Sequence, residues 1–282
     1  MNRTKEAMSI KAKINNYAKS NKITAQTVLQ NFMFERFLER LSKSEYQDKF
    51  IIKGGVLISN MVGLDTRSTM DLDITLRNLP LDEEIILRAM KQISQINLDD
   101  DITFSGFHFS PIRPDDEYGG FRIKFSATYF SIVTPLSIDL STGDKITPQP
   151  MEYDFSPIFG TENSFTLWGY NIETILAEKL QTIISRGIAS TRPRDFYDVY
   201  ILTKEKQFDI KKLKSAFTET CKHRGTENLI KEIDTRMGEI EQSKPLQNLW
   251  LKYTKQFSYA KDIPYEDLMK SLKNLLSTLV TK

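Results

Sequence analysis

Cysteine and histidine are scarce in this chain of 282 residues, which has one cysteine, Cys221, and two histidines, His108 and His223. A single cysteine excludes an intramolecular disulfide and is typical of a reducing compartment. With so few thiol and imidazole groups, a zinc site of the usual kind is not expected. We interpret Cys221 as a structural residue of a helix.

Long apolar runs are also missing. No run approaches the roughly 20 residues needed to span a bilayer, and the lysine-rich N-terminus has no apolar signal core. We therefore expect a cytoplasmic protein with no membrane contact. The composition, 40% hydrophobic and 27% charged residues, is that of an ordinary globular protein. The length allows one large domain or two modest ones.

The net charge of +2 is small, but its distribution along the chain is uneven. Residues 1–53 carry a net charge of +6, residues 54–203 carry −9 and residues 204–282 carry +5. An acidic middle between two basic ends is expected if the middle binds a cation and the ends bind a polyanion. Ordinary solvated helix faces would give the same pattern, so charge alone leaves both interpretations open.

Apolar periodicity predicts an α/β (α+β) protein. Helical spacing predicts helices over residues 4–20, 25–42, 81–97, 171–187, 209–223, 226–242, 245–257 and 264–281. A short apolar run predicts a strand over residues 50–52, and alternation predicts strands over residues 72–76, 102–109, 121–129 and 136–140. We expect the last four to form one mixed sheet with flanking helices. We expect the first two helices to serve as a scaffold, with a nucleic-acid surface as the alternative.

Prolines and glycines are frequent between residues 145 and 169, and we place a domain boundary there. The prediction is an α/β domain with N-terminal helices over residues 1–150 and a helical domain over residues 151–282. In the helical domain, the lysine and arginine excess and the aromatic residues near Trp250 and Tyr253 would suit an RNA backbone and its bases. Aromatic residues at helical spacing are more often part of a core.

Two glycines, Gly54 and Gly55, stand between the predicted strand 50–52 and a helix that begins near Val56. Glycines at such a turn let phosphate oxygens approach the backbone N–H groups, and the N-terminus of a helix favours an anion. We predict a phosphate-binding turn. The alternative is an ordinary tight turn.

Asp71 and Asp73 come next, in an apolar strand segment. Residues two apart in a strand point to the same face, so the two carboxylates should project together. A hard cation such as Mg²⁺, or Mn²⁺ in its place, is held in proteins by one or two carboxylates and by substrate phosphates. The sequence therefore predicts a metal site, against the alternative of two solvated carboxylates.

Asp139 stands between Ile138 and Leu140 in another predicted strand, where burying an unpartnered carboxylate is costly. If this strand lies beside the one that carries Asp73, then Asp139 becomes a third acidic ligand, as phosphoryl transfer with one or two metal ions requires. The alternative is a strand-end residue that shapes the loop after it.

Lys179 lies in the helix predicted at 171–187, and Asp195 and Asp198 lie in the helix that follows Pro193. Residues three apart share a helix face. A lysine that faces this carboxylate pair could bind phosphate and take part in proton transfer. The alternative is an ion-pair cluster that only joins two helices.

The order of these features resembles the nucleotidyltransferase superfamily, and in particular the AbiEii/AbiGii-type toxins. The resemblance is carried by four segments in order: Lys53-Gly54-Gly55 with Arg67-Ser68-Thr69-x-Asp71-Leu72-Asp73, then Asp139, then Glu173-Thr-Ile-Leu-Ala-Glu-Lys179-Leu, then Arg194-Asp-Phe-Tyr-Asp198. It covers about residues 30–203. It departs from the pattern at Gly55, where many nucleotidyltransferases have serine, and we do not assume that Ser68 or Thr69 replaces that hydroxyl.

The resemblance implies a nucleotidyltransferase-like sheet and a role for each matching residue. Asp71, Asp73 and Asp139 would hold the metal, and Lys179 with Asp195 or Asp198 would complete the catalytic set. The nucleotide-binding set would be Lys53, Gly54, Gly55, Arg67, Ser68, Thr69 and Lys179. Between the two aspartates of the second cluster, Asp198 is the preferred residue for activating the acceptor.

The same resemblance implies a magnesium-dependent toxin that transfers a nucleoside monophosphate from an NTP to RNA, such as a tRNA 3′ end. It would belong to a toxin–antitoxin or phage-defence (abortive infection) system with a separate antitoxin. Two alternatives are an NTP-binding regulator without turnover and a nucleotidyltransferase that modifies protein. A metal-dependent nuclease is a weaker alternative, because the Gly54-Gly55 turn has no evident use in it.

Overall fold

The computed structural model describes residues 3–112, 119–159 and 164–280. Its contacts divide the chain into two compact units. The first, here the sheet unit, comprises Met1–Asp144 and Met151–Gly169, and the second, the helical unit, comprises Lys145–Pro150 and Tyr170–Lys282. The fold is a mixed α/β arrangement, as the sequence predicts.

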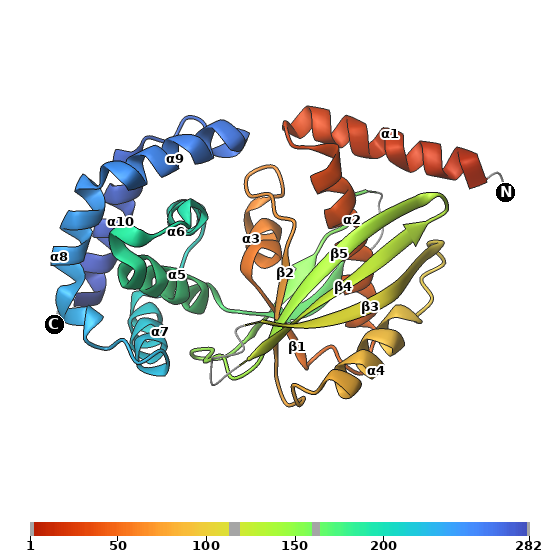
Figure 1. The fold of residues 1–282 in the computed structure, drawn as a ribbon, viewed down its shortest axis with the longest axis horizontal. Coiled ribbons are helices and arrows are strands. Elements are labelled where there is room, and N and C mark those ends of the chain that lie inside the picture. The colour runs from red at the N-terminus through yellow and green to blue at the C-terminus, as the bar shows by residue number, and fades with distance from the viewer. Residues whose placement is uncertain (1–2, 113–118, 160–163, 281–282) are drawn as a thin grey trace. The chain divides into compact units, whose positions relative to one another are not determined.

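A seven-stranded mixed sheet is the centre of the sheet unit (Figure 1), with the strand order β3-β4-β5-β2-β1-β7-β6. The strands are β1 (Phe50–Lys53), β2 (Leu72–Leu76), β3 (Ile102–Ile112), β4 (Gly120–Tyr129), β5 (Ile132–Ser141), β6 (Met151–Phe155) and β7 (Phe165–Gly169). Five of them were predicted. β2 runs parallel to β5 and antiparallel to β1, so the strand that carries Asp73 lies inside the sheet.

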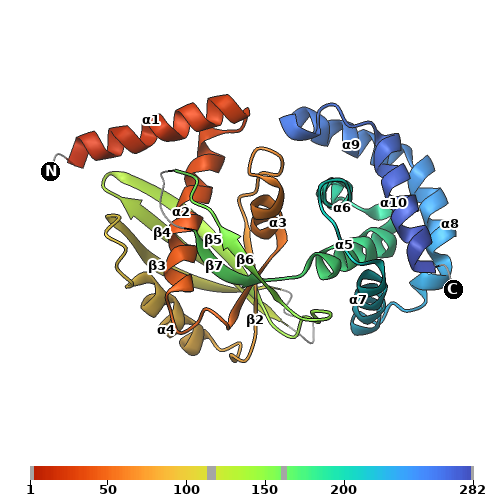
Figure 2. The same cartoon turned by 180° about the vertical axis from the view of Figure 1, so that it is seen from behind.

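Four helices accompany this sheet: α1 (Arg3–Asn21), α2 (Ala25–Ser42), α3 (Gly54–Val62) and α4 (Glu83–Ser94). α2 lies across one face of the sheet (Figures 1 and 2), where the ring of Phe37 contacts those of Phe104 and Phe125. Two arginines of α2 are also buried, and Arg40 pairs with Asp100 at 2.6 Å. α2 is therefore a scaffold helix, in agreement with the preferred interpretation.

β6 and β7 differ from the prediction, which assigned residues 151–169 to a boundary and to the helical domain. The two strands pair with each other, and β7 also pairs with β1 at Ile52 and Gly169. They therefore extend the sheet and belong to the sheet unit. Both strands have five residues, which is too short to give a clear alternation signal beside the neighbouring prolines and glycines.

The helical unit contains α5 (Ile172–Arg186), α6 (Pro193–Glu205), α7 (Ile210–His223), α8 (Leu229–Gln242), α9 (Lys244–Gln256) and α10 (Tyr265–Val280). Asn171 caps α5 by accepting a hydrogen bond from Thr174 N, and Gly187 ends the helix with a φ of +51°. Pro193 occupies the first turn of α6, where its fixed φ suits a helix start. These helix limits agree with the sequence prediction.

Packing in the helical unit uses the leucine stripe of α10, of which Leu268, Leu272 and Leu276 are buried. Cys221 is buried in α7, and burial raises the pKa of its thiol, which agrees with a structural role. Over the part of the chain that the structure describes, no helix combines the length and apolarity that a membrane span needs.

Candidate functional site

The turn between β1 and α3 is built around Gly54, which has a φ of +65°. A Cβ atom at this position would stand 2.1 Å from Oδ2 of Asp73. The side chain of Asp73 thus packs directly over the turn, and only glycine combines this backbone conformation with the space for that carboxylate. The Gly54 turn and the Asp73 carboxylate, which the sequence analysis treated as separate features, are therefore in direct contact.

Gly55 has the same relation to the segment that precedes β2. A Cβ atom there would stand 2.4 Å from Oγ1 of Thr69 and 3.0 Å from Nη1 of Arg67. A serine at position 55, as in many nucleotidyltransferases, would not fit without movement of both side chains. The hydroxyl that borders the turn at this point belongs to Thr69.

The segment from Arg67 to Asp71 is held by hydrogen bonds to α2. Asn31 Nδ2 donates to the carbonyl oxygen of Thr69 at 2.6 Å, and Gln30 Nε2 donates to that of Met70 at 3.1 Å. Gln30 and Asn31 are buried, and the sequence analysis missed their role. Two adjacent polar residues on the buried side of an apolar helix are the signal that would have found them.

Arg67 and Ser68 are also buried in this segment. Arg67 Nη1 donates to the carbonyl oxygen of Ser68 at 2.8 Å, so the guanidinium lies close to the turn. A buried cation beside Gly55 favours an anion at the turn.

A row of four charged residues crosses the sheet at one level, one on each of four neighbouring strands. Lys53 on β1 is opposite Asp73 on β2, Asp73 is opposite Asp139 on β5, and Asp139 is opposite Arg122 on β4. We name these four residues the charged row. Arg122 alternates with Ile123 and Phe125 along β4, and Phe125 contacts α2, so the row faces away from α2. The condition set for Asp139, a strand beside that of Asp73, is met, and its role as a metal ligand stays a prediction.

Arg122 and Asp139 form a bidentate ion pair at one end of the row. Arg122 Nε donates to Oδ1 of Asp139 at 2.7 Å, and Nη2 donates to Oδ2 at 2.7 Å. The hydrogen bonds and charge of Asp139, with smaller contributions from Asp71 and Asp73, raise the pKa of the Arg122 guanidinium above its usual range. Sequence reasoning missed Arg122, because alternation shows which face it occupies but not which residue is opposite.

Lys53, at the other end of the row, contacts polar side chains at the end of β5 and in the loop that follows it. Its Nζ donates to Ser141 Oγ at 2.7 Å and to Asp144 Oδ2 at 2.5 Å, and Thr75 Oγ1 donates to the same carboxylate oxygen. Burial alone would raise the pKa of the Asp144 carboxyl, but Lys53 and the hydroxyl donors outweigh it and hold this pKa below its usual range. The side chain predicted to bind nucleotide is thus also a structural anchor.

The carboxylates suit a divalent cation in part. β2 begins at Leu72, so Asp71 lies just before the strand and is exposed. The charges of Asp71 and Asp73 both contribute to the raised pKa of the Arg122 guanidinium. Across residues 3–112, 119–159 and 164–280, however, no three acidic, histidine or cysteine side chains are arranged to hold a metal. Both oxygens of Asp139 accept hydrogen bonds from Arg122, so this carboxylate is already engaged in an ion pair.

In the helical unit, Lys179 of α5 lies between two carboxylates of α6. Its Nζ is 2.9 Å from Oδ1 of Asp195 and 2.7 Å from Oδ2 of Asp198. The side chains of Asp195 and Asp198 are 3% and 0% exposed, and that of Lys179 is 14% exposed. We name these three residues the lysine cluster. The predicted proximity of the lysine to both aspartates is confirmed.

Arg192 extends the lysine cluster towards solvent, because its Nε lies 2.7 Å from Oδ2 of Asp195 while its side chain is 50% exposed. Trp250 and Tyr253 on α9 are buried. They form part of the core, the interpretation that helical spacing favours, and are not a surface for stacking bases.

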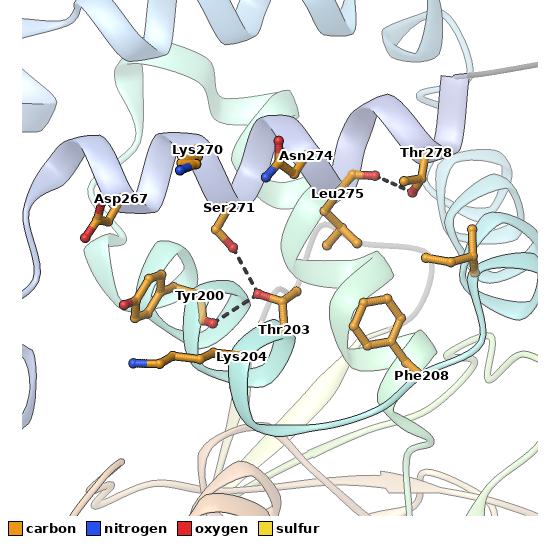
Figure 3. Close-up of a pocket in the computed structure, with 11 residues that line it drawn as sticks. Tyr200, Thr203, Lys204, Phe208, Asp267, Lys270, Ser271, Asn274, Leu275 and Thr278 are labelled. Atoms are coloured by element: carbon orange, nitrogen blue, oxygen red, sulfur yellow. Dashed lines mark hydrogen bonds between the residues drawn. The ribbon is translucent and has the colours of Figure 1, made fainter.

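A pocket of about 470 Å³ lies between α6, α10 and the start of α7 (Figure 3). Phe208 and Leu275 give it an apolar side, and Thr203 is hydrogen-bonded to Ser271 at 2.9 Å. Its described lining residues include none of the predicted site residues. The candidate functional residues are those of the Gly54 turn, the charged row and the lysine cluster, and the pocket contains none of them.

Comparison with known proteins identifies the family and the fold. The family model described as nucleotidyl transferase AbiEii toxin, type IV TA system, matches residues 36–274. No curated protein matches the chain. Among solved structures, MenT4, the nucleotidyltransferase toxin Rv2826c from Mycobacterium tuberculosis H37Rv, is 13% identical, with a TM-score of 0.55, over 96% of this chain and 99% of that chain.

A second similar structure is JHP933 from Helicobacter pylori, which is 16% identical with a TM-score of 0.51 over 91% of this chain and 94% of that chain. At these identities the structural matches establish the fold, whereas the family match covers most of the chain and includes both clusters. The chain belongs to the AbiEii family of nucleotidyltransferase toxins, whose type IV toxin–antitoxin systems imply an antitoxin partner and a nucleoside triphosphate substrate.

Proposed function

We propose that the protein transfers a nucleoside monophosphate from an NTP to RNA, with a tRNA 3′ end as the leading acceptor. The acceptor hydroxyl oxygen would attack the α-phosphorus, the bond from the α-phosphorus to the bridging oxygen would break, and pyrophosphate would leave. The observation that carries the proposal is the contact between the Gly54 turn and the carboxylate of Asp73, because a glycine turn at a helix start suits phosphate and a carboxylate suits a divalent cation.

In the sheet unit, the backbone N–H groups at Gly54 and Gly55 would bind phosphate oxygens at the start of α3. Asp71 and Asp73 would hold Mg²⁺, or Mn²⁺, which would neutralise charge on the triphosphate and on the leaving pyrophosphate. Arg67, buried beside Gly55, would add a fixed positive charge at the turn. Ser68, Thr69 and Lys53 would complete the nucleotide-binding set.

In the helical unit, Lys179 would bind the triphosphate. A lysine paired with two carboxylates is held in one place, which favours binding a phosphate in a single orientation. Asp198 has no exposed side-chain surface, so we assign it and Asp195 a positioning role, through Lys179, ahead of a direct role in activating the acceptor.

The biological setting follows from the family. We propose that the transfer inactivates an essential RNA, that a separate antitoxin opposes the toxin, and that the pair acts in phage defence.

The test is to incubate the pure protein with each α-³²P-labelled NTP, Mg²⁺ and total cellular RNA and protein. The Asp71→Ala/Asp73→Ala double variant runs alongside. A matched control is Glu232→Ala, which removes a surface carboxylate of α8 that is paired only with Arg236 in the described contacts. EDTA in a parallel reaction tests the metal requirement.

Label on RNA that persists in Glu232→Ala, and disappears with EDTA and in the double variant, would support the proposal and identify the nucleotide. Label on protein would contradict an RNA acceptor and support a nucleotidyltransferase that modifies protein. NTP binding with no label on any acceptor would contradict transfer and support a regulator.

A further inference from the structure

Two carboxylates of the charged row, those of Asp73 and Asp139, lie on adjacent strands, and Arg122 neutralises the charge of Asp139. Asp73 and Asp139 are opposite each other on neighbouring parallel strands, which lie about 4.8 Å apart. Like charges that face each other across a sheet destabilise it unless a positive charge is near. Arg122 supplies that charge by binding both oxygens of Asp139.

Arg122 can release Asp139 more readily than a buried arginine could. Its side chain is 47% exposed and that of Asp139 is 24% exposed, so the pair is partly solvated and its net contribution to stability is small. A divalent cation placed between Asp73 and Asp139 would need an oxygen that the guanidinium now binds. The cation and Arg122 therefore compete for the same carboxylate.

We propose that Arg122 is a positioning residue that occupies Asp139 in the metal-free protein and is exchanged for the divalent cation when the site assembles. This inference rests on the proposed function in one respect, which is that Asp71 and Asp73 hold a divalent cation. The exchange would keep the acidic cluster neutralised in both states, by a guanidinium in one and by the metal in the other.

The test measures Mn²⁺ binding without nucleotide, by the loss of the free Mn²⁺ signal in electron paramagnetic resonance. Arg122→Gln should bind Mn²⁺ about three- to tenfold more tightly than the wild type, because a pair of this exposure is worth about 1 kcal/mol. Lys124→Gln is the matched control. It removes the same charge from the same face of β4, opposite Ser137 rather than a carboxylate, and should change the affinity much less.

A second pair of variants tests whether Arg122 acts through Asp139. In the Asp139→Asn background, the additional Arg122→Gln change should give little further gain in Mn²⁺ affinity, since contacts between two residues are measured by such a double-mutant cycle. Thermal unfolding of each variant, without metal, shows that the protein is folded.

Unchanged or weaker Mn²⁺ binding by Arg122→Gln would overturn the inference, as would a gain that persists in full in the Asp139→Asn background or an equal gain in Lys124→Gln. Mn²⁺ binding that is lost in Asp71→Ala/Asp73→Ala, but is indifferent to Arg122, would overturn the exchange alone and leave the proposed metal site intact. The labelled-NTP reaction decides the transfer chemistry independently.

Discussion

The charged row and the lysine cluster each combine lysine or arginine with two aspartates, but they differ in their exposure. Arg122 and Asp139 of the row are 47% and 24% exposed, whereas Asp195 and Asp198 of the lysine cluster are 3% and 0% exposed. The row lies on one face of a sheet, and the cluster lies between two packed helices of the helical unit.

This difference separates two uses of the same chemistry. A partly solvated ion pair costs little to break, so the row can exchange partners with a cation or a substrate. Removing one partner of a buried ion pair leaves an uncompensated charge, which is costly, so the cluster holds its lysine in a fixed position. We therefore expect substitutions in the two clusters to affect stability differently, even where both abolish activity.

The largest expected effect on stability is that of Lys179→Met. It leaves Asp195 and Asp198 buried without their lysine, and we expect it to lower the free energy of unfolding by about 3–5 kcal/mol, measured by urea denaturation. The matched control is Lys273→Met, which breaks a pair with Glu241 whose side chains are 46% and 43% exposed, and it should cost about 0–1 kcal/mol. Equal costs for the two variants would refute the contrast between buried and solvated pairs.

A smaller loss of about 2–4 kcal/mol is expected for Gly54→Ala, because its Cβ would overlap the carboxylate of Asp73 and the backbone has a positive φ. Displacement of Asp73 should also lower nucleotidyl transfer by about 100-fold. Gly106→Ala is a matched control, since Gly106 has a φ of +72° but nothing near the added Cβ. It should cost about 1 kcal/mol and leave transfer unchanged. Equal losses of stability and of nucleotidyl transfer in the two variants would contradict a functional role for the contact between Gly54 and Asp73.

The smallest effect is the pH-dependent contribution of Asp144, which anchors Lys53. Its folded-state pKa is lowered, so its contribution to stability is present above the unfolded-state value and is lost as the pH falls towards the folded-state pKa. We expect Asp144→Asn to cost about 2 kcal/mol at pH 7 and progressively less below pH 4. Chemical denaturation of both proteins from pH 7 to pH 3 measures this, and a cost that does not change with pH would contradict it.

Much of the site was predictable from local sequence patterns. Alternation placed Asp139 in a strand, and the parallel pairing of β2 with β5 then put it opposite Asp73. The three-residue spacing of Asp195 and Asp198 put both on one face of α6, where Lys179 contacts them. In both cases a short-range pattern determines which way the side chain points.

The rest depends on register and on long-range contacts, which short-range patterns do not contain. Arg122 faces Asp139 because β4 pairs with β5 in one of several registers that leave the same face buried. The contact between Lys53 and Asp144 was not predicted, because it depends on where the loop after β5 lies. β6 and β7 were missed because each has only five residues, and because β7 joins the sheet through β1, which is far from it in the chain.

The most direct test of the central claim is an anomalous diffraction measurement on crystals of the protein grown with Mn²⁺ and a non-hydrolysable NTP analogue. The account predicts a manganese peak about 2.1 Å from carboxylate oxygens of Asp71 and Asp73, with phosphate oxygens at the Gly54 turn and the Arg122 guanidinium no longer bound to Asp139. Manganese bound elsewhere, or Arg122 still holding both oxygens of Asp139 beside a bound metal, would contradict it.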